Sequence, residues 1–147
     1  MMEHPYFALQ PPKSTGREVF GKAYAEQFVA KAQQRGLSDA DIVATATAFT
    51  AQTIVEGYIR YVFPACRIDE VIVSGGGAHN GALLAMLQHL LPEQKVLTSG
   101  ELGFSDDAKE AIIFALLGND FMHGIANNLP SATGATRPTV MGKLAFP

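Results

Sequence analysis

The chain is organised around residues 71–81, Val71-Ile72-Val73-Ser74-Gly75-Gly76-Gly77-Ala78-His79-Asn80-Gly81. Three β-branched residues lead directly into three glycines, and apolar residues then recur at helical spacing over residues 83–91. This order predicts a short buried strand, a tight turn and the start of a helix. Asn80 is a favourable N-cap for that helix, because its side chain can accept a hydrogen bond from a free backbone N–H.

The glycines indicate a ligand-binding turn. Glycine tolerates positive φ and has no side chain to hold a ligand away from the backbone, and the free N–H groups of a helix start favour an anionic ligand. We therefore predict that Gly75, Gly76, Gly77 and Asn80 bind a nucleotide. The alternative is that the glycines serve packing alone.

Two familiar phosphate-binding motifs are excluded at this turn. Asn80 stands where the dinucleotide fingerprint G-x-G-x-x-G needs its third glycine, if Gly75 is the first. No Gly-Lys-Ser/Thr follows, so the turn is not a P-loop. A nucleotide bound here is held in another way.

Composition limits the function classes. The 147 residues suit one domain, and 48% hydrophobic against 17% charged residues predicts a folded chain. A net charge of -3 argues against a general nucleic-acid surface. The single cysteine offers neither a disulfide framework nor a thiolate metal cluster, which makes the cytoplasm the simplest location. We expect no secretory signal and no bilayer-spanning segment.

Periodicity predicts three further helices and one further strand. One helix should run from a Ser14 or Thr15 cap to about residue 34, with Glu18 completing a capping box. A long helix should begin after Ser38 and end at Pro64. A second strand is expected at residues 95–98. The last helix, over residues 108–122, is apolar on nearly every face and should be central and buried.

The ends of the chain are less regular. Residues 1–12 should form an extended lead-in, and residues 139–140 and 144–146 could add a short edge strand. The fold class is α/β, helix-rich with a small sheet. Two clear strands make a poor sheet, so we expect a partner domain or subunit to complete it.

Several polar residues have two possible roles, one functional and one structural. Glu110 heads an apolar helical stripe and either faces a cleft or is a solvated first-turn glutamate. Asp106-Asp107 indicates a helix start rather than an acid/base dyad. His79 could touch a ligand or pack beside the strand. Lys13 and Arg17 could bind an anionic group or remain solvated around a capping box. The histidines lack metal-ligand spacing, so we expect no metal site.

Four segments resemble one known family. They are Tyr6-Phe7 with Pro11-Pro12-Lys13-Ser14-Thr15-Gly16-Arg17-Glu18, then Ser74-Gly75-Gly76-Gly77-Ala78-His79-Asn80, then Glu110-Ala111 with Phe114-Ala115, and Asn128-Leu129-Pro130 with Thr133-Gly134-Ala135. In this order they resemble segments of the anhydro-N-acetylmuramic acid kinases. The resemblance covers essentially the whole chain.

The resemblance implies a fold and a reaction. It implies an actin-like (ribonuclease H-like) sugar-kinase fold of two lobes, with ATP and Mg²⁺ used to hydrolyse and phosphorylate 1,6-anhydro-N-acetylmuramic acid. The product is N-acetylmuramic acid 6-phosphate, made during cell-wall recycling. Residues Gly75 to Gly77 would correspond to the adenosine motif, and Glu110 would face the sugar. A homodimer is also implied.

The resemblance is incomplete in one respect. The family's chains are more than twice as long, and we find no counterpart of the phosphate-binding hairpin or of the catalytic aspartate upstream. Residues 1–147 are therefore expected to form a single carboxy-terminal lobe, inactive without the missing amino-terminal lobe. The alternatives are a non-catalytic nucleotide-binding or dimerisation module and a sugar-binding regulator without ATP.

Overall fold

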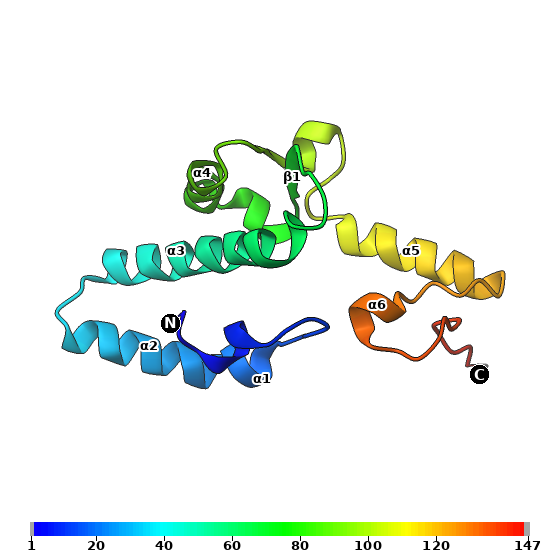
Figure 1. Ribbon diagram of the computed structural model, residues 1–147, viewed down its shortest axis with the longest axis horizontal. Coiled ribbons are helices and arrows are strands. Elements are labelled where there is room, and N and C mark those ends of the chain that lie inside the picture. Colours follow the sequence, from blue (N-terminus) through cyan, green and yellow to red (C-terminus); the bar gives the residue numbers. More distant parts are fainter. Residues whose placement is uncertain (1, 146–147) are drawn as a thin grey trace.

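A computed structural model describes residues 2–145 of the chain. The long helix α3 (Asp39–Gly57) runs through the middle of the molecule (Figure 1). On one side of it lie β1 (Glu70–Val73), α4 (Gly81–Leu90) and β2 (Lys95–Thr98), and on the other lie α1 (Arg17–Phe20) and α2 (Lys22–Gln34). Helices α5 (Lys109–Met122) and α6 (Pro130–Thr133) form an arm that extends away from this body.

The two predicted strands form a parallel pair. Residues Glu70 to Val73 pair in order with Lys95 to Thr98, and α4 makes the connection between the strands. Parallel strands end at the same edge of a sheet, so the turns after β1 and β2 lie next to each other. In open α/β sheets this edge is where ligands bind.

A compact apolar cluster holds the strand pair against α3 and α4. It contains Ala51, Val55, Val71, Leu83, Leu87 and Leu91, and Leu87 and Leu91 are the most completely buried large side chains. These residues come from α3, β1, α4 and the residue that follows α4. Leu83 of this cluster also lies next to Gly77, so the cluster supports one side of the turn after β1.

The long helix begins as predicted and ends in a wider turn. The Ser38 hydroxyl accepts a hydrogen bond from the Asp41 N–H at 3.2 Å, and the Asp41 carboxylate accepts one from the Ser38 N–H at 3.3 Å. This reciprocal pair is a capping box. The helix continues into one π-helical turn, Tyr58–Val62, in which the Phe63 N–H donates to the Tyr58 carbonyl at 2.9 Å.

The helix predicted from Ser14 or Thr15 to residue 34 is wrong in its beginning and its continuity. The N-cap of α1 is Gly16, and the Glu18 carboxylate accepts a hydrogen bond from the Gly16 N–H at 2.6 Å. The helix then breaks at Gly21, where a Cβ atom would stand 2.0 Å from the Arg17 carbonyl oxygen. Only glycine fits such a position, and α2 starts anew beyond it. The expected extended lead-in also contains a 3₁₀ turn, Pro5–Ala8.

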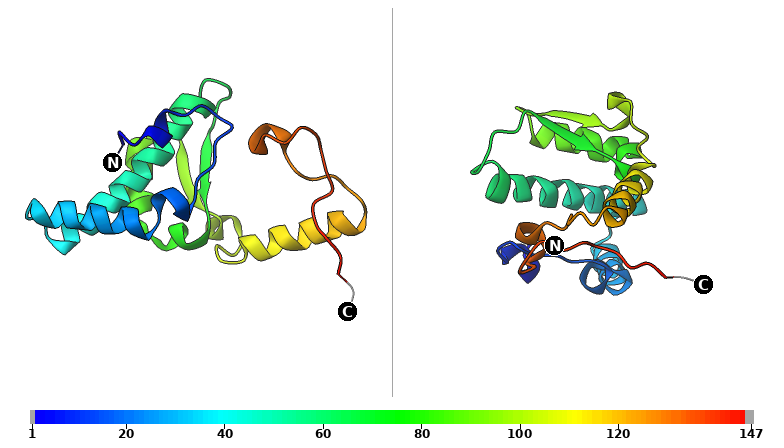
Figure 2. Two further views of the ribbon diagram at one scale, coloured as in Figure 1. Left: turned by 90° about the horizontal axis from the view of Figure 1, so that it is seen from below. Right: turned by 90° about the vertical axis from the view of Figure 1, so that its right-hand side faces the viewer.

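The prediction of a buried last helix is wrong for this chain. None of the residues of α5 is buried; Ile112 is 45% exposed and Phe114 is 70% exposed. The apolar faces are present, but within residues 2–145 no other element packs extensively on them. The left view in Figure 2 shows α5 standing apart from the helices of the main body.

Two further expectations concern the ends and membranes. Residues 139–145 form no strand, and Phe146 lies outside the described residues, so the proposed edge strand is not found where it can be assessed. Within residues 2–145, no helix combines the length and apolarity needed to cross a bilayer.

Candidate functional site

The three glycines of the turn after β1 face different surroundings. They lie in a 3₁₀ turn, Gly75–His79. Gly75 has φ +71°, which favours glycine, and a Cβ at Gly75 or Gly76 would have no atom within 4 Å. A Cβ at Gly77 would touch Leu83 Cδ2 and Val73 Cγ1 at 3.7 Å. Space for a ligand therefore lies above Gly75 and Gly76, whereas Gly77 faces the protein.

Asn80 caps the helix as the sequence predicts. Its side-chain oxygen accepts a hydrogen bond from the Leu83 N–H at 3.1 Å, and α4 begins at the next residue. The Asn80 side chain is thus fixed at the junction between the glycine turn and α4. Beside it lies an open groove of about 390 Å³ between α2, α3 and α4, lined by Phe28, Val29, Val43, Thr47, Asn80 and Leu83 among others. The groove is large enough for a planar base.

Asp106 ties together the turns that follow the two strands. Its backbone carbonyl accepts a hydrogen bond from the Gly75 N–H at 2.8 Å. Its carboxylate accepts from the Ser99 hydroxyl at 2.5 Å and from the Gly100 N–H at 2.9 Å. These bonds, that from Ser99 foremost, hold the pKa of Asp106 below its ordinary value. Asp106 is therefore a structural clasp at the carboxyl edge of the sheet, not merely a helix-start residue.

The sequence alone does not identify Asp106 as a link between the two turns, although it contains a repeated dipeptide that hints at such a link. Each strand is followed by the same dipeptide, Ser74-Gly75 after β1 and Ser99-Gly100 after β2. Two equivalent turns at the end of adjacent parallel strands need a partner for their backbone groups. Asp106 supplies it, with its backbone carbonyl to the Gly75 N–H and its carboxylate to the Gly100 N–H.

The His79 side chain contacts Asp107, in the same loop as Asp106. Its Nε2 lies 3.0 Å from Asp107 Oδ1, and the two side chains are 59% and 77% exposed. The hydrogen bond to Asp107, together with the charge of that carboxylate, raises the pKa of His79 above its ordinary value. The glycine turn is thereby joined to the beginning of α5 by a second contact.

The His79 contact predicts a pH-dependent effect. A raised folded-state pKa means that the pair stabilises the fold fully below the ordinary histidine pKa, and that this contribution is lost as pH rises through the raised value. Asp107→Asn should lower the pKa of His79 and weaken this dependence, leaving only the smaller effect of the Asp106 charge. Titration of the His79 ring signals by NMR measures the change directly. An unchanged His79 pKa in the variant would contradict the assignment.

Glu110 is exposed in the first turn of α5. Within residues 2–145 it makes no hydrogen bond or ion pair, and Phe114, one turn further on, is exposed as well. The structure therefore places Glu110 on the helix that starts at the Asp106–Asp107 loop, without bringing it into contact with the glycine turn. Its carboxylate is available to a group outside the described chain.

Lys13 and Arg17 are not brought together as an anion site. Lys13 lines a pocket between the amino-terminal segment and α3, whereas Arg17 lies outside that lining. The Lys13 ammonium donates to the Tyr6 carbonyl at 3.3 Å. The described residues contain no group of three His, Cys, Asp or Glu side chains that could hold a metal ion.

The strand pair and its clasped glycine turn define an α/β protein with an open glycine turn at the carboxyl edge of a parallel sheet. A family profile described as anhydro-N-acetylmuramic acid kinase matches residues 1–147. The chain belongs to this family.

Individual relatives agree with the family assignment. The chain is 42% identical to the anhydro-N-acetylmuramic acid kinase of Caldanaerobacter subterraneus over 99% of its own length, and 45% identical to those of Bacillus cereus and Salinibacter ruber over 99% and 100%. It spans only 37%, 38% and 37% of the length of these three relatives. Most of each relative therefore has no counterpart in this chain.

Proposed function

We propose that this chain is the carboxy-terminal lobe of an ATP-dependent kinase with an actin-like fold. The complete kinase hydrolyses 1,6-anhydro-N-acetylmuramic acid and phosphorylates it to N-acetylmuramic acid 6-phosphate during cell-wall recycling in the cytoplasm. The observation that carries the proposal is the glycine turn, which is open above Gly75 and Gly76 and lies at the carboxyl edge of parallel strands. The names of the relatives support the choice of substrate.

ATP fits the two features that meet at Asn80. The phosphate-bearing sugar of the nucleotide would lie over Gly75 and Gly76, where the absence of side chains lets it approach the backbone. The adenine base would enter the groove between α2 and α3, whose wall is mainly apolar. Asn80 stands between the two parts, held by its hydrogen bond to the Leu83 N–H.

The chain's own residues would divide the remaining work. Asp106 and Asp107 hold the turn in place through Gly75 and His79. Glu110, on the helix that starts from the same loop, would accept a hydrogen bond from a sugar hydroxyl. Mg²⁺ is implied by the reaction, but the described residues offer no cluster of metal ligands. The ion would be held mainly by phosphate oxygens and by the part of the kinase outside this chain.

The first test is activity of the isolated chain. Supplied with ATP, Mg²⁺ and anhydro-N-acetylmuramic acid, the 147-residue chain should release no sugar phosphate, whereas the complete kinase should do so under the same conditions. The reason is that most of the length of the kinase relatives is absent. Chromatographic detection of the phosphorylated sugar measures the result. Turnover by the isolated chain at about 1 per second or more would overturn the single-lobe proposal.

We also propose that the complete kinase is a homodimer. Val43 on α3 is 66% exposed and Ile72 on β1 is 52% exposed, and both edges of the two-stranded sheet are unpaired within the described residues. Exposed apolar surface and open strand edges favour association. Light scattering at micromolar concentration should give twice the mass of one chain. A mass of one chain that does not change with concentration would contradict the dimer.

A further inference from the structure

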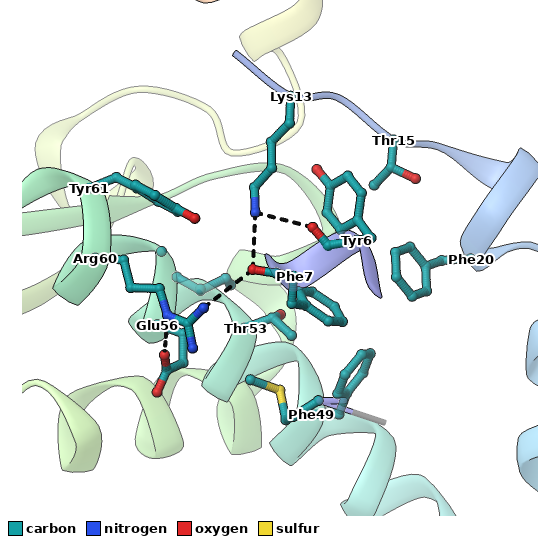
Figure 3. A pocket seen from close by; sticks show the side chains of 13 residues that line it. Tyr6, Phe7, Lys13, Thr15, Phe20, Phe49, Thr53, Glu56, Arg60 and Tyr61 are labelled. Carbon is teal, nitrogen blue, oxygen red and sulfur yellow. Dashed lines mark hydrogen bonds and ion pairs between the residues drawn. The ribbon is translucent and has the colours of Figure 1, made fainter. Parts of the chain in front are cut away.

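A second pocket lies on the other side of α3 from the strand pair. It has a volume of about 410 Å³ and is lined by the amino-terminal segment, by Phe20 at the end of α1, and by the carboxyl-terminal half of α3 with its π-helical turn. Figure 3 shows its lining, to which no residue between 62 and 145 contributes. The pocket is therefore distinct from the glycine turn and from Glu110.

Two cations converge in this pocket on one neutral acceptor. The Lys13 ammonium lies 3.5 Å from the Phe7 carbonyl oxygen, and Arg60 Nη1 donates to the same oxygen at 3.3 Å (Figure 3). The only carboxylate in the lining is that of Glu56, which pairs with Arg60 Nε at 2.8 Å. Lys13 forms no ion pair within residues 2–145. The pocket thus carries one positive charge that no described acidic group balances.

Aromatic rings surround this charge. The Lys13 ammonium lies 4.9 Å from the centroid of the Tyr6 ring and 5.2 Å from that of Tyr61. Phe7 adds a flat apolar wall, with its ring 5.5 Å from that of Phe20. Cation–π contacts stabilise an ammonium but do not neutralise it. The Lys13 ammonium therefore keeps its charge, and the cavity of about 410 Å³ beside it offers a flat or apolar ligand body aromatic rings to pack against.

A hydroxyl group in the same lining has no partner. The Oγ1 atom of Thr15 is buried, and within the described residues it makes no hydrogen bond. Buried polar groups in folded proteins almost always have a partner, and an orphan needs an explanation. A ligand oxygen that accepts from this hydroxyl would satisfy it.

We propose that this pocket binds a small organic anion, a carboxylate or phosphate ester with a flat or apolar body. The anionic group pairs with the Lys13 ammonium, and a ligand oxygen accepts from the Thr15 hydroxyl. The body packs against the Tyr6 and Phe7 rings. Each part of this ligand answers one observation. The anionic group matches the unbalanced charge of Lys13, an oxygen matches the unpartnered Thr15 hydroxyl, and the body matches the ring-lined cavity. The proposal is independent of the nucleotide site, because the two sets of lining residues do not overlap.

The test uses the whole chain and phenyl phosphate as the probe. Amide signals of Lys13, Thr15 and Tyr61 should shift and saturate during an NMR titration up to about 10 mM, the range of a weak small-ligand site. Benzoate should also bind at the same residues. This second titration tests whether the anionic group can be a carboxylate. Inorganic phosphate and benzyl alcohol each carry half of the required chemistry and should bind at least about tenfold more weakly.

Three variants complete the test. Lys13→Met should weaken phenyl phosphate binding at least about tenfold, whereas Lys22→Met, at a lysine that is 89% exposed, should leave it unchanged. Thr15→Val removes the orphan hydroxyl without opening a cavity, so it should weaken binding while the melting temperature stays equal or rises. This variant guards against a Lys13 effect that comes from misfolding.

Three outcomes would overturn the proposal. One is the absence of saturable shifts at the pocket residues. The second is a set of shifts confined to the glycine turn or to α5. The third is unchanged affinity in Thr15→Val and Lys13→Met. The nucleotide proposal survives each of these results, because none of them concerns ATP.

Discussion

Gly76→Val should abolish ATP binding by the complete kinase and leave its melting temperature unchanged. A Cβ atom at this position meets no protein atom within 4 Å, and Gly76 does not have a positive φ. Within the described residues, the backbone conformation and the open space around Cβ therefore allow a side chain at this position. The branched side chain instead fills the space that the nucleotide would occupy. Calorimetric titration with ATP should show a loss of affinity of at least about a hundredfold, or roughly 2.7 kcal/mol.

Two other glycine variants separate ligand binding from backbone strain. Gly76→Ala adds a single methyl group to the same open space and should give a smaller loss of affinity with an unchanged melting temperature. Gly75→Ala should lower the melting temperature, because φ is +71° there and a left-handed conformation costs a non-glycine residue about 1–2 kcal/mol. If Gly76→Val bound ATP as tightly as the parent, the turn would be a packing element alone.

Glu110→Gln should reduce turnover by the complete kinase about ten- to a hundredfold. Glutamine keeps the size of the side chain and most of its hydrogen-bonding capacity but removes the charge. A hydrogen bond to a charged group contributes about 1.5–3 kcal/mol, which corresponds to this loss of rate if the bond is made to a sugar hydroxyl in the transition state. The melting temperature should change little, because Glu110 is exposed and its carboxylate makes no hydrogen bond or ion pair within residues 2–145. Steady-state kinetics with the anhydro sugar measures the effect.

A matched variant controls for loss of charge in general. Glu26→Gln makes the same substitution on α2, where the carboxylate is 65% exposed and lies 3.7 Å from Lys22 Nζ. It should leave turnover unchanged. If the activity of Glu110→Gln stayed within about twofold of the parent, the Glu110 charge would lower the activation free energy by less than ~0.5 kcal/mol. Glu110 would then be a solvated helix-start glutamate.

The parts of the fold that depend on neighbouring residues were predictable. The β-branched run before Gly75, the Asn80 cap and the Ser38 capping box each act over a few residues, and each is found where the sequence indicates. The break at Gly21 was not predictable from periodicity. It depends on the distance between position 21 and the Arg17 carbonyl, which exists only once the chain has folded.

Burial and long-range contacts were the parts that the sequence could not determine. The sequence predicts the apolar faces of α5 correctly. Burial, however, needs a second element that packs on those faces, and the described residues supply none that covers Ile112 or Phe114. The bond between Gly75 and Asp106 joins positions far apart in the chain, so the repeated Ser-Gly dipeptides indicate two similar turns but do not identify Asp106 as their partner. The nucleotide role of Gly75, Gly76, Gly77 and Asn80 and the sugar role of Glu110 stay predictions.

The consecutive order of α3, β1, α4 and β2 has a consequence for biosynthesis. The packing of α3 on α4 and the pairing of β1 with β2 join elements that are close in the chain, and such local contacts form quickly because little loop entropy is lost. The strand pair and its apolar cluster can therefore assemble on the ribosome as soon as residue 98 has emerged. The clasp at Asp106 is translated only afterwards. The glycine turn would then remain loosely held during translation and become rigid only when the start of α5 docks against it.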